Sequence, residues 1–505
     1  MPREASSWRP NMSTRRTVLK SIIATGSVAI FSGAVGTLSS LAASAVPIRR
    51  SLHGMALNDP DLSTYRDFVG LMLGKDQSKP LSWLGYSLQH GVYGGGFKYC
   101  PHGDWYFLPW HRGYVSMYEQ AARELMKNPS FAMPYWDWTV DRTMPSAFTD
   151  SQYNGKSNPL YVAGRTLSTS NWPLKDSVVG PAVMQSIYAE TVFQRFGTSK
   201  NPAQNSLDMS WVVRGGGTQG TLEANPHNNI HNFIGMYMPT AGSPRDPIFM
   251  MHHGNIDRIW AYWNGLGRSN TSGMDSATAN LWLKMNFANN YIDSNGNTYG
   301  AVVQNLQSTT ALGYTYDNLP PKADGRVFDP ERNQRLTALF ELGSSVKSAQ
   351  VFGLLPDVEN QAATLTAPLS KTARLHPATR DTVLATAPTE RHGAEVFALL
   401  REIELTPGIE SLKVFVNAPS VSPDTPESDP HFVTRIGFFA HGEHDAHHKA
   451  APSILVDLTD TLRRLATEKL LGGESITVQL LPELRAGSDP EAERAVPASV
   501  EIGIL

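Results

Sequence analysis

Residues 246–260 read DPIFMMHHGNIDRIW, and this stretch predicts the start of a helix that carries two adjacent histidines. Asp246 stands where a helix cap is favoured, and Pro247 stands where proline suits the first helical residue. Apolar residues then recur with a helical period over residues 252–266. We therefore expect His253 at the beginning of a helix whose apolar face packs into a core.

Further helical patterns surround this one in the sequence. They cover residues 81–90, 111–127 and 225–235. We therefore predict a mainly helical first domain over residues 46–319, with long loops at residues 91–104 and 141–225.

The pattern changes in the last third of the chain. Residues 320–392 are rich in Ala, Thr and Pro and predict a connector, with a helical piece at residues 335–342. Residues 393–505 predict a small, mainly β, sandwich-like domain with one helix at residues 458–471. Its expected strands are residues 412–416, 431–440, 475–481 and 499–504. The predicted fold class is mainly α, with this β domain at the C-terminus.

The N-terminus has the pattern of an export signal. The pair Arg15 and Arg16 precedes a weakly apolar segment at residues 21–41 and a small-residue run that ends at Ala45. This order is typical of a twin-arginine signal at residues 1–45, so we expect a periplasmic or secreted protein. A transmembrane anchor is the alternative, although glycine and serine interrupt the segment. No later stretch is apolar for long enough to span a bilayer.

Composition argues against a polyanionic partner. Charged residues make up 18% of the 505 residues, and the formal net charge is −3. No field of one sign would draw the chain to nucleic acid or to an anionic membrane. Nucleic acid is therefore not an expected partner.

Six of the fifteen histidines fall into two groups with metal-ligand spacing. These groups are His90, His102 and His111, and His227, His231 and His253. His227 and His231 are four residues apart, so on a helix both face the same side. Inward-facing helices of a four-helix bundle can build a metal pair from such side chains. Two ordinary helical histidines are the alternative for this pair, and imidazole suits copper and zinc alike.

Residues 100–112 (CPHGDWYFLPWHR) and 246–260 resemble the two copper motifs of the tyrosinase, catechol oxidase and haemocyanin family. The resemblance spans about residues 89–263, and the overall arrangement is similar to exported proteobacterial tyrosinases. It implies two copper ions with dioxygen as co-substrate, and small phenols as substrates. By this resemblance, His90, His102 and His111 hold one copper, and His227, His231 and His253 hold the other.

The resemblance also bears on the single cysteine. Fungal tyrosinases and molluscan haemocyanins carry a Cys-x-His whose sulfur is joined to the ring of the middle ligand, and Cys100 and His102 have that spacing. A thioether between Cys100 and His102 is therefore implied, and a free buried thiol is the alternative. In the family's pattern the second histidine of the adjacent pair is the ligand, so His252 is expected beside the site and not on the metal.

The implied activity is hydroxylation of tyrosine-like monophenols to o-diphenols and oxidation of o-diphenols to o-quinones. Glu223 matches the position at which plant members hold a water, and Asn228 matches the residue that orients this water in hydroxylating members. Together they favour hydroxylation. The alternative is that Glu223 and Asn228 only stabilise the start of a helix.

Other interpretations remain open at this stage. They are a catechol oxidase without hydroxylase activity, a haemocyanin-like oxygen carrier and a zinc hydrolase, although no HExxH motif is present. We further expect Phe249 to pack on a ligand ring and Asp257 to pair with Arg258. The C-terminal domain is expected to act as a lid over the site, and the histidine-rich residues 441–448 as a polar surface loop or a transient copper site.

Overall fold

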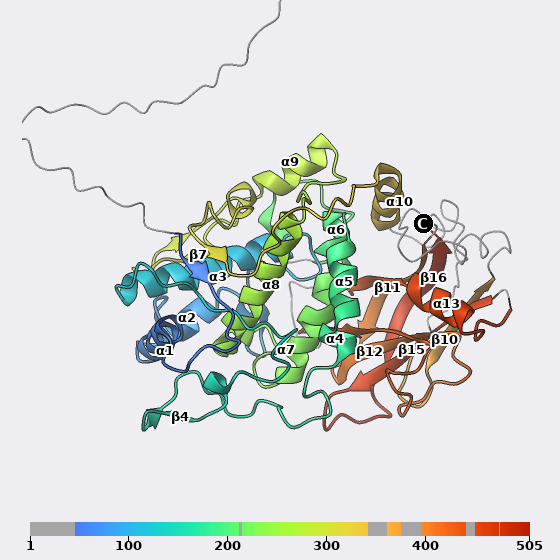
Figure 1. Ribbon diagram of the computed structural model, residues 1–505, viewed down its shortest axis with the longest axis horizontal. Helices are drawn as coiled ribbons and strands as arrows, with labels where there is room; N and C mark the ends of the chain where they lie inside the picture. Colours follow the sequence, from blue (N-terminus) through green and yellow to red (C-terminus); the bar gives the residue numbers. More distant parts are fainter. Residues whose placement is uncertain are drawn as a thin grey trace, which may run out of the picture. The chain divides into compact units, whose positions relative to one another are not determined.

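A computed structural model describes residues 46–211, 215–341, 361–374, 395–440, 450–473 and 475–504. Helices dominate as far as residue 341, and strands dominate beyond it (Figure 1). The helices of the first part are α1 (Pro60–Leu73), α2 (Trp83–Ser87), α3 (Phe107–Leu125), α4 (Asp176–Val179), α5 (Pro181–Ala189), α6 (Phe193–Phe196), α7 (Asn228–Ile234), α8 (Ile248–Gly265), α9 (Ser276–Lys284) and α10 (Pro330–Glu341). The predicted helical domain is therefore confirmed in its class.

α8 (Ile248–Gly265) begins earlier than the pattern over residues 252–266 indicates, and its N-cap is Pro247 instead of the expected Asp246. Asp246 Oδ1 accepts a hydrogen bond from the Ile248 N–H at 3.1 Å, which satisfies one of the first backbone donors of the helix. α3 also begins early, at Phe107, before the predicted start at His111. Proline is tolerated in the first helical turn, so Pro109 does not delay the helix.

The expected pairing of Asp257 with Arg258 is wrong. Asp257 Oδ1 accepts a hydrogen bond from Arg112 Nε of α3 at 2.5 Å, and Asp257 Oδ2 accepts one from Arg49 at 3.1 Å. Arg258 instead lies near Asp137, with Arg258 Nη2 3.6 Å from Asp137 Oδ2. Adjacent residues on a helix do not face each other, so the real partners come from other elements. The ion pair with Arg112 ties α3 to α8 beneath the histidines.

The segment predicted as one long loop, residues 141–225, contains three short α-helices within its described residues. α5 starts with Pro181 at its first position, and α4 and α6 are single turns. Short helices of this length have too few residues to show a clear period in the sequence.

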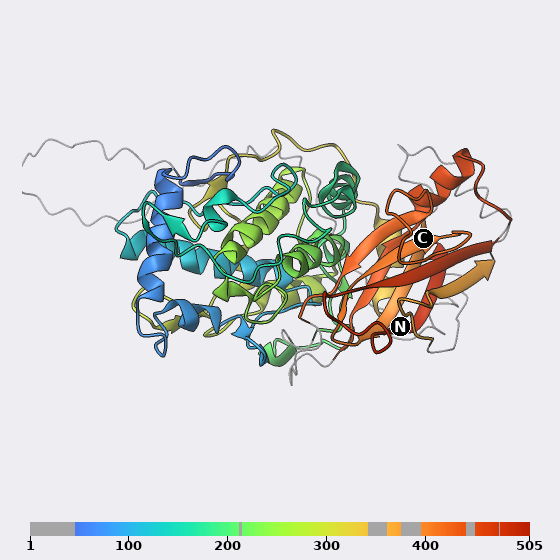
Figure 2. The same cartoon turned by 90° about the horizontal axis from the view of Figure 1, so that it is seen from below.

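Two four-stranded sheets form the C-terminal part (Figure 2). The first has the order β10-β15-β12-β13 and the second the order β16-β11-β14-β6. The strands are β10 (Leu369–Arg374), β11 (Val396–Leu405), β12 (Ile409–Val416), β13 (Phe432–Gly437), β14 (Ser453–Asp457), β15 (Ser475–Leu484) and β16 (Ala495–Ile504). One apolar cluster contains side chains from both sheets, as in a sandwich, and the helix α13 (Thr459–Thr467) packs on it.

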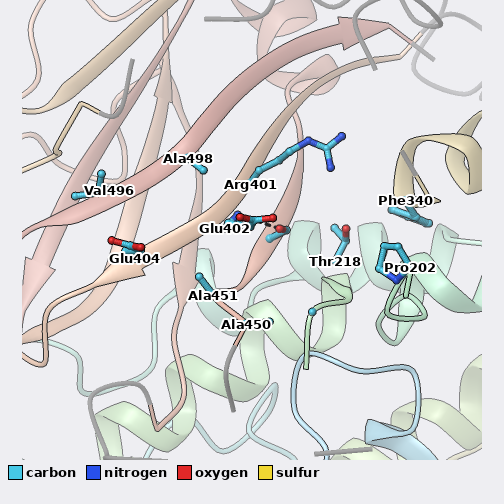
Figure 3. Close-up of a pocket in the computed structure, with 12 residues that line it drawn as sticks. Pro202, Thr218, Phe340, Arg401, Glu402, Glu404, Ala450, Ala451, Val496 and Ala498 are labelled. Atoms are coloured by element: carbon cyan, nitrogen blue, oxygen red, sulfur yellow. Dashed lines mark hydrogen bonds between the residues drawn. The ribbon is translucent and has the colours of Figure 1, made fainter. Parts of the chain in front are cut away.

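One strand of the second sheet belongs to the helical part of the chain. β6 (Thr218–Gln219) pairs in parallel with Ser453 and Ile454 of β14. Thr218, Arg401 and Ala498 line a cavity of about 440 Å³ beside this junction (Figure 3). The two parts therefore share backbone hydrogen bonds, and no histidine lines this cavity.

Three sequence predictions fall on other residues. The export signal at residues 1–45, part of the connector and the histidine-rich residues 441–448 lie outside the described residues. Within the described ranges, no helix combines the length and the apolar character that a membrane crossing needs.

Candidate metal centre

The first histidine group comes together beside the start of α3. One ring nitrogen each of His90, His102 and His111 and the sulfur of Cys100 lie within 4.8 Å of one another, and all four residues are buried. His111 is on α3, whereas His90 follows α2 and His102 lies on a loop. The bundle prediction placed each ligand on a helix. In the structure, the loop before α3 supplies the middle ligand, His102.

The second group gathers around α7 and α8. His253 Nε2 lies 3.4 Å from His227 Nε2 and 3.1 Å from His231 Nε2. Two nitrogens that bind one ion at about 2.0–2.1 Å in a tetrahedral arrangement lie about 3.3 Å apart. The three nitrogens therefore have the spacing of a metal site.

Backbone and amide oxygens orient the rings. His90 Nδ1 lies 2.6 Å from the carbonyl oxygen of Ala241. His231 Nδ1 lies 2.7 Å from the carbonyl oxygen of Met238. His111 Nδ1 is likewise 2.8 Å from the carbonyl oxygen of Phe107. A hydrogen bond at Nδ1 directs Nε2 to the metal and fixes the tautomer.

The two groups face each other. The rings of His111 and His253 are stacked, with centroids 4.3 Å apart and planes at 13°. The rings of His102 and His227 are 5.4 Å apart at 26°. Ions held by the two groups would therefore share one space, as two-metal oxygen chemistry requires.

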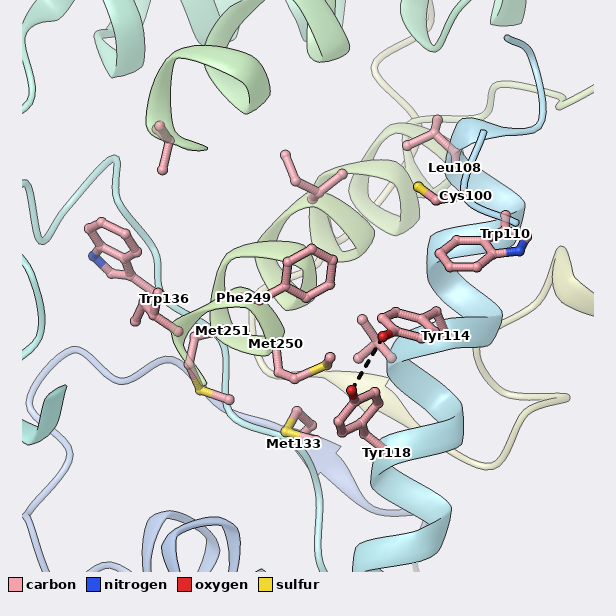
Figure 4. Close-up of a cluster of buried hydrophobic side chains, with 14 of the residues drawn as sticks. Cys100, Leu108, Trp110, Tyr114, Tyr118, Met133, Trp136, Phe249, Met250 and Met251 are labelled. Carbon is pink, nitrogen blue, oxygen red and sulfur yellow. Dashed lines mark hydrogen bonds between the residues drawn. The ribbon is translucent and has the colours of Figure 1, made fainter. Parts of the chain in front are cut away.

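His252 and Phe249 both stack on rings of the second group, and the role of His252 as a residue that does not bind the metal stays a prediction. His252 stacks on the His227 ring at 5.3 Å and 21°, next to the second group, although its nitrogen is also within 4.8 Å of that group. Phe249 stacks on the His253 ring at 4.1 Å and 24°. Figure 4 shows Phe249 projecting from α8 toward Trp110 and Tyr114 of α3. The packing prediction for Phe249 is confirmed.

Burial keeps the imidazoles neutral, which is the form that binds metal. It lowers the pKa of His227 to about 3, and it also lowers the pKa of His111, His231 and His253. Imidazole sets of this kind suit copper. The chain thus fits a pair of copper ions held by three histidines each.

Cys100 is buried against the first group. Its sulfur lies 3.3 Å from His111 Nε2 and within 4.8 Å of a His102 ring nitrogen. Burial raises the pKa of this thiol. The thioether between Cys100 and His102 stays a prediction.

Glu223 lies beneath His102, on an irregular turn before α7. Its Oε1 accepts a hydrogen bond from the Gly103 N–H at 2.8 Å and is 3.2 Å from His102 Nδ1. Its Oε2 accepts one from the Thr198 hydroxyl. Burial raises the pKa of Glu223 to about 7. Thr198 is distant in sequence, and no motif around it marked this role.

Asn228 has contacts in two directions. Its Oδ1 lies 2.8 Å from His227 Nδ1, and its Nδ2 donates to the Gly437 carbonyl of the β part at 2.9 Å. The expected position of Asn228 beside the second group is therefore observed, together with a contact that the sequence did not indicate.

A phenylalanine from the β part covers the histidines. The Phe439 ring centroid lies 4.5 Å from that of His102 and 4.4 Å from that of His231, which places it between the two groups. Phe439 is buried there with 9% of its surface exposed. Sequence reasoning missed this residue because it follows β13, far from either motif.

Copper should stabilise the folded chain, because the two histidine groups exist only in that state. At free copper near 100 times the dissociation constant, each site adds about 2.7 kcal/mol to the free energy of unfolding. Thermal unfolding with and without a chelator measures this. His231→Ala should lower bound copper from two ions to one per chain, and an unchanged copper content would remove His231 from the site.

Comparison with known proteins agrees with this geometry. Residues 63–266 match the family model described as the common central domain of tyrosinase. A tyrosinase of Hahella sp. (strain CCB-MM4) is 26% identical over 494 residues, which cover 86% of this chain and 95% of that protein. The tyrosinase of Streptomyces glaucescens is 32% identical over 31% of this chain and 61% of its own length. By contrast, the chain spans only 37% of the chloroplastic polyphenol oxidase of Vitis vinifera.

Solved structures share the fold over both parts of the chain. Latent apple tyrosinase has a TM-score of 0.63 at 20% identity and covers 91% of this chain and 97% of its own. A latent aurone synthase has a TM-score of 0.61 at 22% identity, and the match covers 91% of this chain and 90% of that protein. Two facing histidine groups, the matched central domain and the shared two-part fold lead to one assignment. Residues 63–266 carry the common central domain of tyrosinase, and their two facing histidine groups fit the dicopper site of a phenol-oxidising oxidoreductase.

Proposed function

We propose that this chain hydroxylates monophenols to o-diphenols, in addition to oxidising o-diphenols to o-quinones. The observation that carries the proposal is that Glu223 and Asn228 both contact histidines of the metal groups. When bound, the two copper ions supply the binding and two-electron reduction of dioxygen. The chain's own residues then have to orient the phenol and receive its proton.

Glu223 is suited to hold a water that accepts this proton. Each carboxylate oxygen offers two acceptor positions, so Oε1 is filled by Gly103 and His102, and Oε2, bound by Thr198, has one position for a further partner. Asn228 Oδ1 contacts His227 Nδ1 and so fixes the orientation of the His227 ring. This contact keeps the second histidine group in a constant position relative to the water. A monophenol needs this proton transfer before its oxygen can bind a metal, and the step depends on a positioned base.

Glu223→Gln should therefore impair monophenol hydroxylation more than diphenol oxidation. Loss of a positioned base typically costs about 10²-fold or more, and the amide keeps the size and most hydrogen bonds of the side chain. Initial rates on a matched pair of phenols, at equal copper content, measure the ratio. An equal loss on both substrates would assign Glu223 a purely structural role.

An oxygen carrier is the second candidate function. Phe439 favours it, because a covered pair of histidine groups admits dioxygen more easily than a phenol. We propose instead that residues 393–505 form a lid that keeps an enzyme closed, with Phe439 as the side chain that fills the site. The two candidates differ in what happens once Phe439 is removed.

We also propose export by the twin-arginine route to the periplasm or beyond the cell. The support is the order of Arg15, Arg16, the apolar segment and Ala45 in the sequence. Replacing Arg15 and Arg16 by lysine should leave the protein in the cytoplasm, as fractionation of a bacterial host would show. Unchanged export of this variant would contradict the proposed route.

A further inference from the structure

A second cavity lies where the helical part of the chain meets the β sandwich. It has a volume of about 270 Å³, and its walls come from α5, α6, α10 and α13 and from the strands β11, β13 and β14. None of the six metal-group histidines lines it. Pockets for drug-sized ligands start at about 300 Å³, so this cavity suits a smaller molecule.

The guanidinium group of Arg195 faces this cavity without a partner. Arg195 is on α6, and only 5% of its surface is exposed. Among the described residues, none accepts a hydrogen bond from its side chain or forms an ion pair with it. Its guanidinium carbon lies 5.9 Å from the centre of the Phe397 ring of β11. A buried charge without a partner is unfavourable, so an anion that reached it would be held there.

The other arginines of the wall already have partners. Arg332 donates to Glu190 at 3.0 Å and to Glu395 at 2.9 Å. Arg464 donates to a backbone carbonyl, and Arg435 is paired with carboxylates outside the cavity. Among the described residues of this wall, Arg195 is therefore the arginine whose side chain is left for a ligand.

Nearby carboxylates do not remove the need for an anion at Arg195. Glu190 and Asp457 attract the guanidinium through space and without contact, and burial still lowers the pKa of Arg195. A lowered pKa means that the charged form is disfavoured at this place, although a guanidinium stays protonated in proteins. A ligand with a negative charge would stabilise this charged form.

The wall also has an apolar portion, which restricts the ligand further. Ile187 of α5, Phe397 of β11 and Leu455 of β14 all line the cavity. Apolar walls favour a hydrocarbon body, and the planar guanidinium group matches the paired oxygens of a carboxylate. One free guanidinium balances one negative charge, so a monocarboxylate suits the cavity better than a phosphate dianion.

We propose that this cavity binds a small monocarboxylate with a short, branched apolar body, and that Arg195 holds its carboxylate. The hydrocarbon portion packs between α5 and β11. Because the ligand contacts the helical part and the sandwich together, it stabilises the junction between them. The site takes no part in oxidation at the histidine groups, so this inference does not depend on the proposed function.

The test compares isovalerate with its neutral amide, isovaleramide, on the copper-loaded full-length protein. The two compounds share their shape, so a difference in affinity isolates the charge. Calorimetry should give isovalerate a Kd at least about tenfold lower than the amide, the range of a hydrogen bond to a charged group. Arg195→Met should remove this preference, and Arg195→Lys should keep part of it.

Arg142→Met is the matched control, because copper can also bind a carboxylate. Arg142 pairs with Asp176 at 2.7 Å and is not part of the cavity wall. This variant should keep the wild-type preference for isovalerate. A preference that persists in Arg195→Met would place the binding elsewhere and overturn the proposal. Equal affinity for both compounds, or no binding of either to the wild-type protein, would overturn it as well.

Thermal unfolding gives a readout that does not need a ligand. Because Arg195 is buried without a partner, Arg195→Met should unfold at a Tm equal to or above that of the wild type. Isovalerate should then raise the Tm of the wild type more than that of Arg195→Met. A lower Tm of ligand-free Arg195→Met would show that the distant carboxylates already satisfy this arginine, and the proposal would fail.

Discussion

Phe439→Ala is expected to raise kcat/KM for a small o-diphenol by about 10- to 100-fold. The wild-type ring is buried against His102 and His231, where it competes with substrate for one space. Burying a phenylalanine side chain is worth about 1.5–3 kcal/mol, which corresponds to this range in the equilibrium between covered and open sites. Alanine leaves the histidines and their hydrogen bonds unchanged. Initial rates of quinone formation on copper-loaded protein measure the effect.

Phe328→Ala provides a matched control in the same chain. Phe328 is half-buried against a separate apolar cluster that contains none of the six metal-group histidines, so this variant should keep wild-type kinetics. Should Phe439→Ala bind dioxygen reversibly but oxidise no diphenol, the oxygen carrier would be the better assignment. Unchanged turnover in both variants would show that the ring does not limit access.

The metal groups could be predicted because their information is local. His227 and His231 share a helical face by spacing alone, and Asp246 contacts the first residue of α8, which is two residues away in the sequence. Phe249 stacks on His253 for the same reason, since both lie on one helix. Short-range geometry of this kind can be read from residue order.

The position of Phe439 over the histidines and the ion pairs of Asp257 could not be predicted from residue order. Phe439 reaches the histidines only because β13 ends beside α7, and nothing near residue 439 resembles a metal motif. Asp257 was assigned to its sequence neighbour, whereas its partners Arg49 and Arg112 come from other elements. The helical class and the strands β12, β13, β15 and β16 were predicted from periodicity, but their contacts with the site depend on tertiary packing.

Asp257→Asn is expected to lower the free energy of unfolding by about 3–5 kcal/mol, the usual cost of breaking a buried ion pair. Asp257 accepts hydrogen bonds from Arg49 and Arg112, and the hydroxyls of Tyr314 and Tyr316 also donate to it, at 2.7 and 2.6 Å. Arg49 is itself fully buried and has one other carboxylate partner, Glu119, at 2.8 Å. An amide at position 257 leaves two buried arginines with one fewer negative charge beside them.

The pH dependence of this pair has a definite sign. Burial alone would raise the pKa of Asp257, but Arg112 and Arg49 outweigh it, and the pKa is lowered from 3.8. The stabilisation is therefore present above about pH 4 and is lost as the pH falls through the lowered pKa. The wild-type protein should lose this contribution in acid, and Asp257→Asn should lack it at neutral pH.

Arg49 links this network to β1 (Ile48–Arg49), at the N-terminal end of the described residues. β1 pairs with β9 (Thr315–Tyr316) next to the tyrosines that bind Asp257. Denaturant unfolding followed by tryptophan fluorescence measures the change, with exposed Asp150→Asn as a control expected within about 0.5 kcal/mol of wild type. If Asp257→Asn unfolds like this control, the ion pairs of Asp257 add little to the free energy of unfolding.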